Sequence, residues 1–167
     1  EIIGFVHSDD LLYDENVISK IASLFLKKKI DGVYGDLQYV KKKQTNKVVR
    51  YWKSSQYKSG MLKKGWMPAH PTFFLKKTIY LTHGKFNLKY KISADYDFMI
   101  RILKDNNLKF YYFSSIITLM RIGGNSNKSI KNILNKIIED YRIIKLNNIG
   151  NIFTLLNKNI SKLEQFL

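Results

Sequence analysis

Apolar and polar positions alternate along the chain in a way that predicts short strands and helices in succession. The apolar run at residues 2–6 is typical of a buried strand, and the acidic turn at residues 8–10 ends it. A buried strand needs neighbours on both sides, so we expect this chain to be the later part of a longer protein. A helix-start signal at residues 14–16 is followed by apolar residues at helical spacing from Val17 to Phe25.

Two further strand patterns predict a β-hairpin in the next part of the chain. Residues 32–40 and 48–52 are rich in strand-forming residues, and the polar segment 41–47 between them predicts a turn. The aromatic-rich segment 66–75 holds both prolines and leads from a loop into a strand. A short helix is expected over residues 77–83, before a glycine that suits a helix C-terminus.

A helix that begins near Ser93 places a carboxylate among apolar side chains. The serine can cap this helix, and the predicted apolar stripe consists of Phe98, Met99, Ile102 and Leu103. Asp95 lies three and four residues before Phe98 and Met99, so we expect its side chain to share their inward face. Asp97 lies four residues before Arg101, so these two side chains can form an ion pair.

The last third of the chain predicts two strands and two amphipathic helices. The strands cover residues 108–113 and 116–121, and a glycine-rich turn at 123–126 follows them. The first helix, over about 129–146, carries an apolar stripe of Ile130, Ile133, Leu134, Ile137, Ile138 and Tyr141. A weaker stripe consists of Ile152, Leu155, Leu156, Ile160 and Leu163. The pattern indicates an α/β fold over residues 1–126, followed by C-terminal amphipathic helices over 127–167.

Length and composition narrow the class of protein. A chain of 167 residues is one domain or part of one, and 45% hydrophobic residues are enough for a real core. No apolar run is long enough to predict a membrane-spanning helix. Cysteine is absent, which excludes a disulfide framework and a thiolate metal site and fits a reducing, cytoplasmic setting.

The chain is strongly basic, with a net charge of +16 from 29 Lys and Arg against 13 Asp and Glu. Nucleic acid, an anionic membrane surface or an anionic substrate could each account for such a charge. Most of the excess is lysine spread along the chain, which an AT-rich genome would also produce. Because the chain shows no known nucleic-acid motif, we expect no nucleic-acid partner.

The acidic turn after the first strand is the strongest sign of chemistry. Asp9 and Asp10 are adjacent carboxylates that repel each other, which favours a bound divalent cation. Oxygen ligands suit Mg²⁺ or Mn²⁺, and either ion would take further oxygens from water or a diphosphate. The alternative is a turn in which Ser8 and the two acids lead into the next helix.

Three segments in a fixed order resemble one enzyme family. They are residues 4–10, residues 66–74, and residues 94–97 with Arg101. The tripeptide 34–36 lies between them and the segment 121–126 follows them. This set resembles the bacterial family 2 glycosyltransferases, which have the GT-A fold and use nucleotide-sugar donors, and the match covers residues 1 to about 150. The resemblance implies a partial GT-A, Rossmann-like mixed sheet flanked by helices, without the N-terminal nucleotide-binding half.

The resemblance also implies roles for individual residues. Asp10 matches the last carboxylate of the Asp-x-Asp-type motif that binds the metal carrying the donor diphosphate. Asp9 matches its neighbour, near the ribose or the metal, and Ser8 stands where many members have a first acid. Asp95 matches the general base of inverting members. Many members have a glutamate before that base, where this chain has Ala94.

Four further residues are candidates by the same resemblance. Trp66, His70 and Asp97 would lie on the acceptor side of the site, and Arg121 would contact the donor diphosphate.

Structural roles are open alternatives at several of these positions. Asp95 could cap the start of its own helix, and His70, between two prolines, could be a packed loop residue. Arg121 could form an ion pair at the end of its strand. Asp36, in the predicted hairpin, could be satisfied by nearby backbone groups.

The predicted function is transfer of a sugar from a nucleotide-sugar donor to a glycan or lipid-linked acceptor. The reaction would be inverting and would depend on Mn²⁺ or Mg²⁺, with Asp95 as the base. Such an enzyme would build a surface polysaccharide, a lipopolysaccharide or a glycoprotein glycan. The lysine-rich surface and amphipathic tail suit peripheral contact with the cytoplasmic face of a membrane. The alternative is a basic, non-enzymatic module that binds nucleic acid or an anionic membrane surface.

Overall fold

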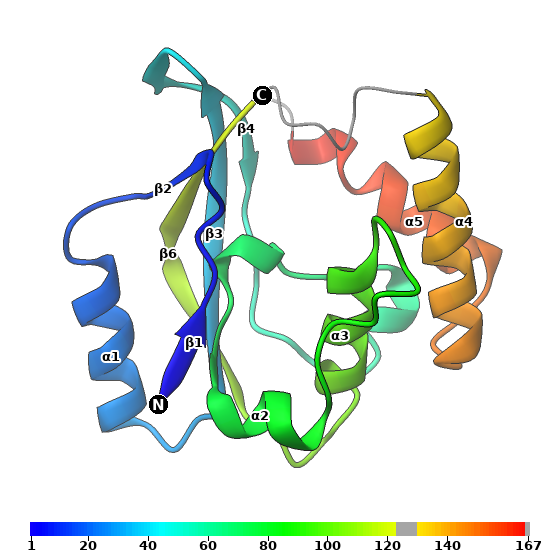
Figure 1. Ribbon diagram of the computed structural model, residues 1–167, viewed down its shortest axis with the longest axis horizontal. Coiled ribbons are helices and arrows are strands. Elements are labelled where there is room, and N and C mark those ends of the chain that lie inside the picture. The colour runs from blue at the N-terminus through cyan, green and yellow to red at the C-terminus, as the bar shows by residue number, and fades with distance from the viewer. Residues whose placement is uncertain (123–129, 166–167) are drawn as a thin grey trace.

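A twisted mixed sheet separates helix α1 from the other helices (Figure 1). The computed structural model describes residues 1–122 and 130–165. The strands are β1 (Ile2–Gly4), β2 (Asp10–Leu12), β3 (Gly32–Lys41), β4 (Gln44–Trp52), β5 (Phe74–Lys76) and β6 (Phe110–Arg121). The α-helices are α1 (Val17–Lys27), α2 (Lys77–Thr82), α3 (Ala94–Leu103), α4 (Ile130–Leu146) and α5 (Ile152–Ile160). Short 3-10 helices are η1 (Leu62–Lys64), η2 (His70–Thr72) and η4 (Leu163–Gln165).

Strand β3 is the centre of the sheet. The strand order is β1-β5-β3-β6-β2, and β4 pairs with the second half of β3. Only the β3–β6 pair is parallel among the described strands, so the sheet is mixed as predicted. The predicted hairpin is confirmed, although its strands continue further into the polar segment and β4 already begins at Gln44.

The pairing of β3 with β6 contains two consecutive irregularities, one on each side of Asp36. Tyr34 pairs with Tyr112, whereas Asp36 pairs with Ile116, so β6 carries extra residues at this point. A bulge of this kind bends a strand and increases its twist. The glycine between Tyr34 and Asp36 lies against the bulge, because a Cβ atom there would come within 2.8 Å of the Phe113 and Ser115 carbonyl oxygens. A side chain at this position would therefore push the two strands apart.

The first strand lies at the edge of the sheet, which corrects the prediction of a buried strand. Within residues 1–122 and 130–165, β1 pairs with β5 alone. Ile2 is 37% exposed and Val6, beyond the end of the strand, is 50% exposed. The apolar run thus has one strand neighbour, where a buried strand would have two.

Helix α3 supplies much of the larger of two core clusters. The predicted stripe of Phe98, Met99, Ile102 and Leu103 is completely buried, as the spacing indicated. On the other face of the sheet, Val17 and Ile21 of α1 pack with residues of β3 and β5 in a second cluster. Both helices are therefore held by apolar burial, as their periodicity predicted.

The stripes predicted for the two C-terminal helices do not face the core. On α4, Ile133, Leu134, Ile137, Ile138 and Tyr141 are all exposed, and the side chain of Ile130 lies outside the described residues. The buried positions are instead Asp140, Ile143 and Ile144. On α5 only Leu155 of the predicted stripe is buried, with Thr154 and Lys158 beside it. Both helices turn a partly polar face inward, which apolar periodicity alone could not indicate.

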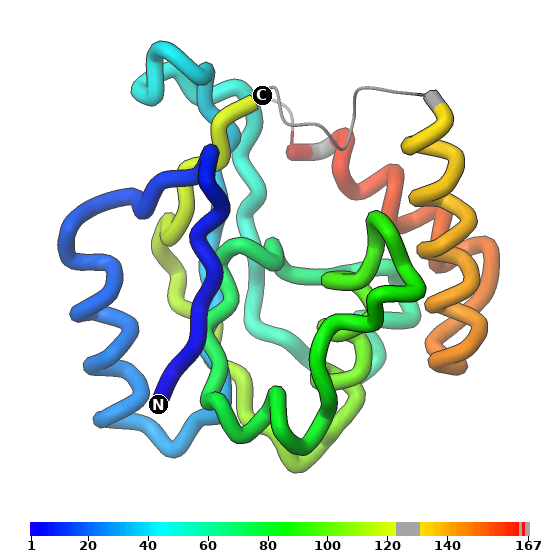
Figure 2. Tube along the Cα trace, viewed as in Figure 1, coloured from blue at the N-terminus to red at the C-terminus, as the bar shows by residue number. Residues whose placement is uncertain are grey.

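Several polar contacts attach these helices to the rest of the fold. Figure 2 shows the chain running from α4 into α5, which lies beside it. The Thr154 hydroxyl donates to the Lys63 carbonyl oxygen at 2.8 Å. Gly65 has φ +79°, and a Cβ atom there would come within 2.6 Å of the backbone nitrogen of Lys158. The glycine therefore permits α5 to approach η1 closely.

Two expectations concern residues that the structure does not describe. The glycine-rich turn at 123–126 and the boundary expected between residues 126 and 127 lie outside the described residues. No helix in the described part of the chain is both long enough and apolar enough to cross a membrane.

Candidate active site

Asp10 is a buried carboxylate at the start of β2. It is 7% exposed, and its Oδ2 atom has no hydrogen-bond partner among the described residues. Burial raises the pKa of Asp10, the charge of His7 opposes this rise, and the adjacent Asp9 adds to it. A carboxylate in this position would be stabilised by a cation.

Asp9 has basic neighbours that the sequence did not place beside it. Its Oδ1 atom lies 3.8 Å from Lys42 Nζ and 3.9 Å from Arg121 Nη2. The Arg121 guanidinium also donates to the backbone carbonyl oxygens of Ser8 and Asp9. The structure therefore shows the strand-end ion pair that was an alternative for Arg121, and diphosphate contact by this residue stays a prediction.

Asp95 lies in the first turn of α3 and is partly exposed. Its Oδ1 atom accepts a hydrogen bond from the Tyr96 N–H at 2.8 Å. The Ser93 side chain makes no capping bond at this helix start. Instead, the Glu139 carboxylate of α4 accepts the N–H groups of Lys91, Ile92 and Ser93 at 2.8–3.0 Å. The loop before Asp95 is thus held by the C-terminal helical layer.

Two histidines lie between Asp95 and the acidic turn. The rings of His7 and His70 have centroids 6.1 Å apart. Burial lowers the pKa of His70, while the charge of Asp95 raises it and that of His7 lowers it further. Since His7 also acts on the pKa of Asp10, electrostatic contact runs from Asp95 through the histidines to Asp10. Asp95, His70, His7 and Asp10 are thus linked by charge effects on pKa, and the roles of Asp95 as base and Asp10 as metal ligand stay predictions.

Asp97 has a different environment from Asp95. It is buried, and its Oδ2 atom accepts a hydrogen bond from Arg101 Nε at 3.0 Å, which confirms the predicted ion pair. The same guanidinium donates to the Lys85 carbonyl oxygen at 2.7 Å and to that of His83. The carboxylate thus anchors a loop through Arg101, and acceptor contact by Asp97 stays a prediction.

Asp36 is buried and well supplied with donors. Tyr51 Oη lies 2.6 Å from its Oδ2 atom, and Tyr112 Oη and the Ser54 N–H lie 2.8 Å from its Oδ1 atom. Burial is the main reason that the pKa of Tyr112 is raised to about 12, with the hydrogen bond to Asp36 adding to it. These contacts give Asp36 a structural role, which was the alternative stated for it, with tyrosines as the main donors.

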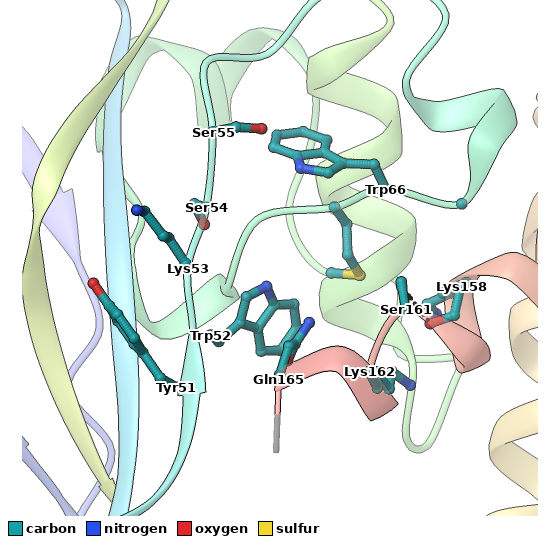
Figure 3. A pocket seen from close by; sticks show the side chains of 12 residues that line it. Tyr51, Trp52, Lys53, Ser54, Ser55, Trp66, Lys158, Ser161, Lys162 and Gln165 are labelled. Carbon is teal, nitrogen blue, oxygen red and sulfur yellow. Dashed lines mark hydrogen bonds between the residues drawn. The ribbon is translucent and has the colours of Figure 1, made fainter. Parts of the chain in front are cut away.

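A cavity of about 310 Å³ lies between the end of β4, the segment after η1, and α5 with η4 (Figure 3). Trp66 lines this cavity, so the predicted acceptor-side tryptophan faces open space. The sequence did not single out Trp52, Lys158 or Lys162, which also line it. A lysine three residues after Leu155, on the buried side of α5, was the signal that could have indicated Lys158.

The described residues contain no group of three or more His, Asp or Glu side chains that could hold a metal ion. Asp10 and Asp9 could therefore supply oxygen ligands only as part of a set completed by a bound molecule or by water. Asp95 stands apart from them beyond the two histidines. Cation binding by Asp9 and Asp10 and proton transfer to Asp95 therefore stay predictions.

Comparison with known proteins gives a distant similarity. No family model matches the chain. Proteins named "PGL/p-HBAD biosynthesis glycosyltransferase" from Mycobacterium bovis (strain BCG) and Mycobacterium tuberculosis (strain H37Ra) are 28% identical to it over 125 residues. The match covers 74% of this chain and 46% of each relative, so the chain spans about half the length of the relatives it matches. The chain is therefore similar, over most of its length, to part of proteins named as glycosyltransferases.

Proposed function

We propose that the chain forms the catalytic and acceptor side of a family 2 glycosyltransferase of the GT-A type. It would transfer a sugar from a nucleotide-sugar donor to a glycan or lipid-linked acceptor, with inversion at the anomeric carbon. The observation that carries this proposal is the buried Asp10 Oδ2 atom, which has no partner among the described residues and lies in a turn with His7, whose ring is 6.1 Å from that of His70. The distant similarity to proteins named as glycosyltransferases supports the reaction class.

Asp95 is the base in this proposal. Its carboxylate takes the proton of the acceptor hydroxyl while the hydroxyl oxygen attacks the anomeric carbon. The bond from that carbon to the diphosphate oxygen breaks on the opposite face, which inverts the configuration. Burial lowers the pKa of His70, which favours the neutral ring. A neutral imidazole can donate a hydrogen bond to a sugar hydroxyl through one nitrogen or accept one through the other.

Asp10 and Asp9 would hold a divalent cation, Mn²⁺ or Mg²⁺. The fit rests on the buried Asp10 Oδ2 atom, which has no partner in the described part of the chain. When bound, the cation would neutralise the charge that develops on the departing diphosphate. Arg121, already beside Asp9, would add a second positive charge near the same oxygens.

The exposed face of α4 supports a proposal of peripheral membrane contact. This face is formed by Leu134, Ile137, Ile138 and their exposed apolar neighbours, and exposed Lys131, Arg142 and Lys145 lie on the same helix. An apolar face bordered by cations suits the interface of an anionic membrane. Such contact at the cytoplasmic face would bring the site to a lipid-linked acceptor in surface polysaccharide or lipopolysaccharide synthesis.

A basic binding module without enzymatic activity is the rival proposal. It would account for the net charge of +16, but it gives no role to the buried carboxylate of Asp10. The two proposals differ in what stabilises the protein. A nucleoside diphosphate with Mn²⁺ should raise the melting temperature of a transferase, whereas a nucleic-acid module should bind DNA with strong salt dependence.

The direct test uses the full-length enzyme, with its nucleotide-binding half, and measures nucleoside diphosphate released from a panel of nucleotide sugars with Mn²⁺. Asp95→Asn should lower turnover by about a hundredfold or more, because a positioned base contributes about 10²–10⁴ to the rate. It should leave stabilisation by the nucleoside diphosphate intact. Glu15→Gln, which removes an exposed carboxylate, is the matched control. Unchanged turnover in Asp95→Asn would reject this residue as the base.

A further inference from the structure

The cavity of Figure 3 contains an unpaired polar group among aromatic side chains. Ser54 is 6% exposed, and its hydroxyl has no hydrogen-bond partner in the described residues. Its backbone N–H is fixed by Asp36 at 2.8 Å, so the residue cannot easily turn away. Trp66 stacks on Tyr57 with ring centroids 5.6 Å apart and also borders the cavity. A buried hydroxyl without a partner indicates a site that a ligand oxygen can complete.

Two lysines of the C-terminal helical layer reach this cavity but differ in their partners. Lys158 is 2% exposed, and its Nζ atom lies 2.6 Å from Asp140 Oδ2 and 3.2 Å from the Tyr96 ring centroid. Its charge is therefore already balanced. The Nζ atom of Lys162 donates to the neutral Asn159 Oδ1 atom at 3.3 Å. This leaves Lys162 as a cation that faces the cavity with a neutral hydrogen-bond partner.

Lys136 and Arg50 act on Lys162 as like charges. Burial, and next the charge of Lys136, lower the pKa of Lys162 to about 8, while Asp140 and Asp95 act in the opposite direction and Arg50 adds to the lowering. Bringing an anion into the cavity would relieve this repulsion. The charge of Asp95 is also among those that act on Lys162.

Close packing and a hydrogen bond fix the side of the cavity that α5 and η4 form. Gly65 lets α5 approach η1, because a side chain there would collide with the backbone of Thr154 and Lys158. Gln165 of η4 accepts a hydrogen bond from Arg50 Nε at 3.0 Å, which ties the end of the chain to β4. The cavity is therefore built from segments that are fixed on both sides.

We propose that this cavity binds a phosphate group of the acceptor, with Lys162 and Ser54 donating to its oxygens and Trp66 contacting the attached sugar. The proposal rests on the proposed function and narrows the acceptor to a phosphate ester. A sugar phosphate and a lipid-linked phosphate share this chemistry. The phosphate would anchor the acceptor while a sugar hydroxyl reaches Asp95.

Tryptophan fluorescence can test the proposal directly, since the chain has two tryptophans and both line the cavity. We would titrate the metal-free protein with glucose 1-phosphate, hexyl phosphate and glucose. Saturable emission changes with either phosphate ester, and none with glucose, are expected. A response to glucose 1-phosphate alone would indicate a soluble acceptor, and a stronger response to hexyl phosphate would indicate a lipid-linked one. Equal responses to glucose and glucose 1-phosphate would overturn the proposal.

Variants identify the side chains that donate hydrogen bonds to the phosphate. Lys162→Gln should weaken glucose 1-phosphate binding by about tenfold, the usual effect of losing one charge-assisted hydrogen bond, and Lys162→Arg should keep most of it. Ser54→Ala should weaken binding less, and Lys63→Gln, an exposed lysine of η1, should not change it. Circular dichroism confirms that each variant is folded. Undiminished binding in both folded variants, Lys162→Gln and Ser54→Ala, would overturn the proposal.

The same titration separates this proposal from the proposed function. Binding of a phosphate ester needs neither donor nor turnover, so Lys162-dependent binding without sugar transfer would reject the transferase and keep the phosphate site. If a nucleoside diphosphate changes the tryptophan emission and glucose 1-phosphate does not, the cavity binds the sugar donor and not the acceptor. That outcome would overturn acceptor binding there.

Discussion

At the scale of single residues, Asp95 and Asp97 show how two carboxylates in one helical turn acquire different tasks. Asp97 is buried and engaged by Arg101, whereas Asp95 is partly exposed and lies near His70. The sequence indicated Asp95 as the more inward of the two, because helical spacing measures only position around the axis. Burial also depends on neighbouring segments, and Arg101, the partner of Asp97, donates to the carbonyl oxygens of His83 and Lys85.

The pKa of His70 offers a test of the site geometry that requires no substrate. Its pKa should lie below the usual 6.5 because of burial. Asp95→Asn should lower it further, since the aspartate charge favours the imidazolium, and His7→Gln should raise it. NMR titration of the histidine Hε1 signals measures these shifts. A His70 midpoint that neither substitution moves would show that the three side chains are not neighbours.

The lowered pKa of His70 predicts the direction in which the stability of the protein changes with pH. Because its folded-state pKa is lowered, the unfolded chain binds the proton more readily than the folded protein. The protein should therefore lose stability as the pH falls from 6.5 through the folded-state pKa. His70→Gln should remove this part of the pH dependence.

Gly65 is a position where any side chain should be costly. A Cβ atom would come within 2.5 Å of the Thr154 carbonyl oxygen and 2.6 Å of the Lys158 nitrogen, and φ is +79°. Gly65→Ala should lower the free energy of unfolding by roughly 2–4 kcal/mol through overpacking and backbone strain. Urea denaturation measures this change.

Gly60 provides the matched control for that substitution. Its φ is +87°, but a Cβ atom there would have nothing within 4 Å. Gly60→Ala should therefore cost only the strain of a left-handed conformation, about 1 kcal/mol. If Gly65→Ala and Gly60→Ala lowered the free energy of unfolding equally, the close packing of α5 on η1 would add nothing to the cost of a side chain at residue 65.

At the scale of elements, periodicity predicted which segments form helices better than which face each helix buries. The stripe of α3 is buried because α3 packs against the sheet layer across its apolar side. The stripe of α4 is exposed because that helix packs through Asp140, Ile143 and Ile144. A second surface, such as a membrane, can select an apolar face as strongly as a core does, and periodicity cannot separate the two.

Binding to vesicles tests the exposed face of α4. We expect the chain to sediment with vesicles that contain anionic lipid and to be released by high salt. Leu134, 55% exposed, and Ile137 lie on this face, and the double substitution Leu134→Asp, Ile137→Asp should reduce binding by about tenfold or more, because two apolar contacts are lost and two repulsive charges are added. Leu88→Asp, on another exposed leucine, should leave binding unchanged. Equal binding by both variants would exclude α4 as the contact.

The sheet was predictable in its parts and not in its order. The hairpin of β3 with β4 follows from local turn and strand signals, which the sequence contains. The parallel pairing of β3 with β6 joins segments about seventy residues apart, and no local signal reports it. For the same reason the sequence could not show that Arg121 of β6 would meet Asp9, or that α5 would line the cavity beside Trp66.

At the scale of the whole molecule, the C-terminal helical layer is part of the site and not an appendage. Glu139 of α4 holds the loop before Asp95, and Lys158 and Lys162 of the last segment line the cavity. The sequence analysis divided the chain into an α/β part over residues 1–126 and amphipathic helices over 127–167. These contacts join residues on both sides of that division, and the division itself stays a prediction.

The buried pair of Asp140 and Lys158 should be important for joining α4 to α5. Asp140→Asn would leave the Lys158 charge without its partner at 2.6 Å, which should cost roughly 3 kcal/mol of unfolding free energy. Lys136 also contacts Asp140 but is one-third exposed, so Lys136→Gln should cost less than about 1 kcal/mol. Denaturant unfolding compares the two variants. A smaller loss in Asp140→Asn than in Lys136→Gln would contradict this assignment.

Acid should weaken the same junction. Burial opposes the effect, but the charges of Lys158 and Lys136 hold the pKa of Asp140 below its usual 3.8. A lowered folded-state pKa means that the carboxylate stabilises the fold above pH 3.8, and this contribution is lost as the pH falls through the folded-state value. As the pH is lowered, the free energy of unfolding of Asp140→Asn should therefore fall less than that of the unchanged protein. Urea denaturation at a series of pH values measures this difference.

In the irregular stretch of β6 opposite Asp36, the number of residues decides to which side of the sheet the later side chains of the strand point. From Tyr34 to Leu37 the central strand advances three residues, while its partner advances six, from Tyr112 to Thr118. Deleting one residue from 113–115 would make that count odd and would invert the facing of all later side chains in the strand. Arg121 would then point away from Asp9, although no residue of the acidic turn had been altered.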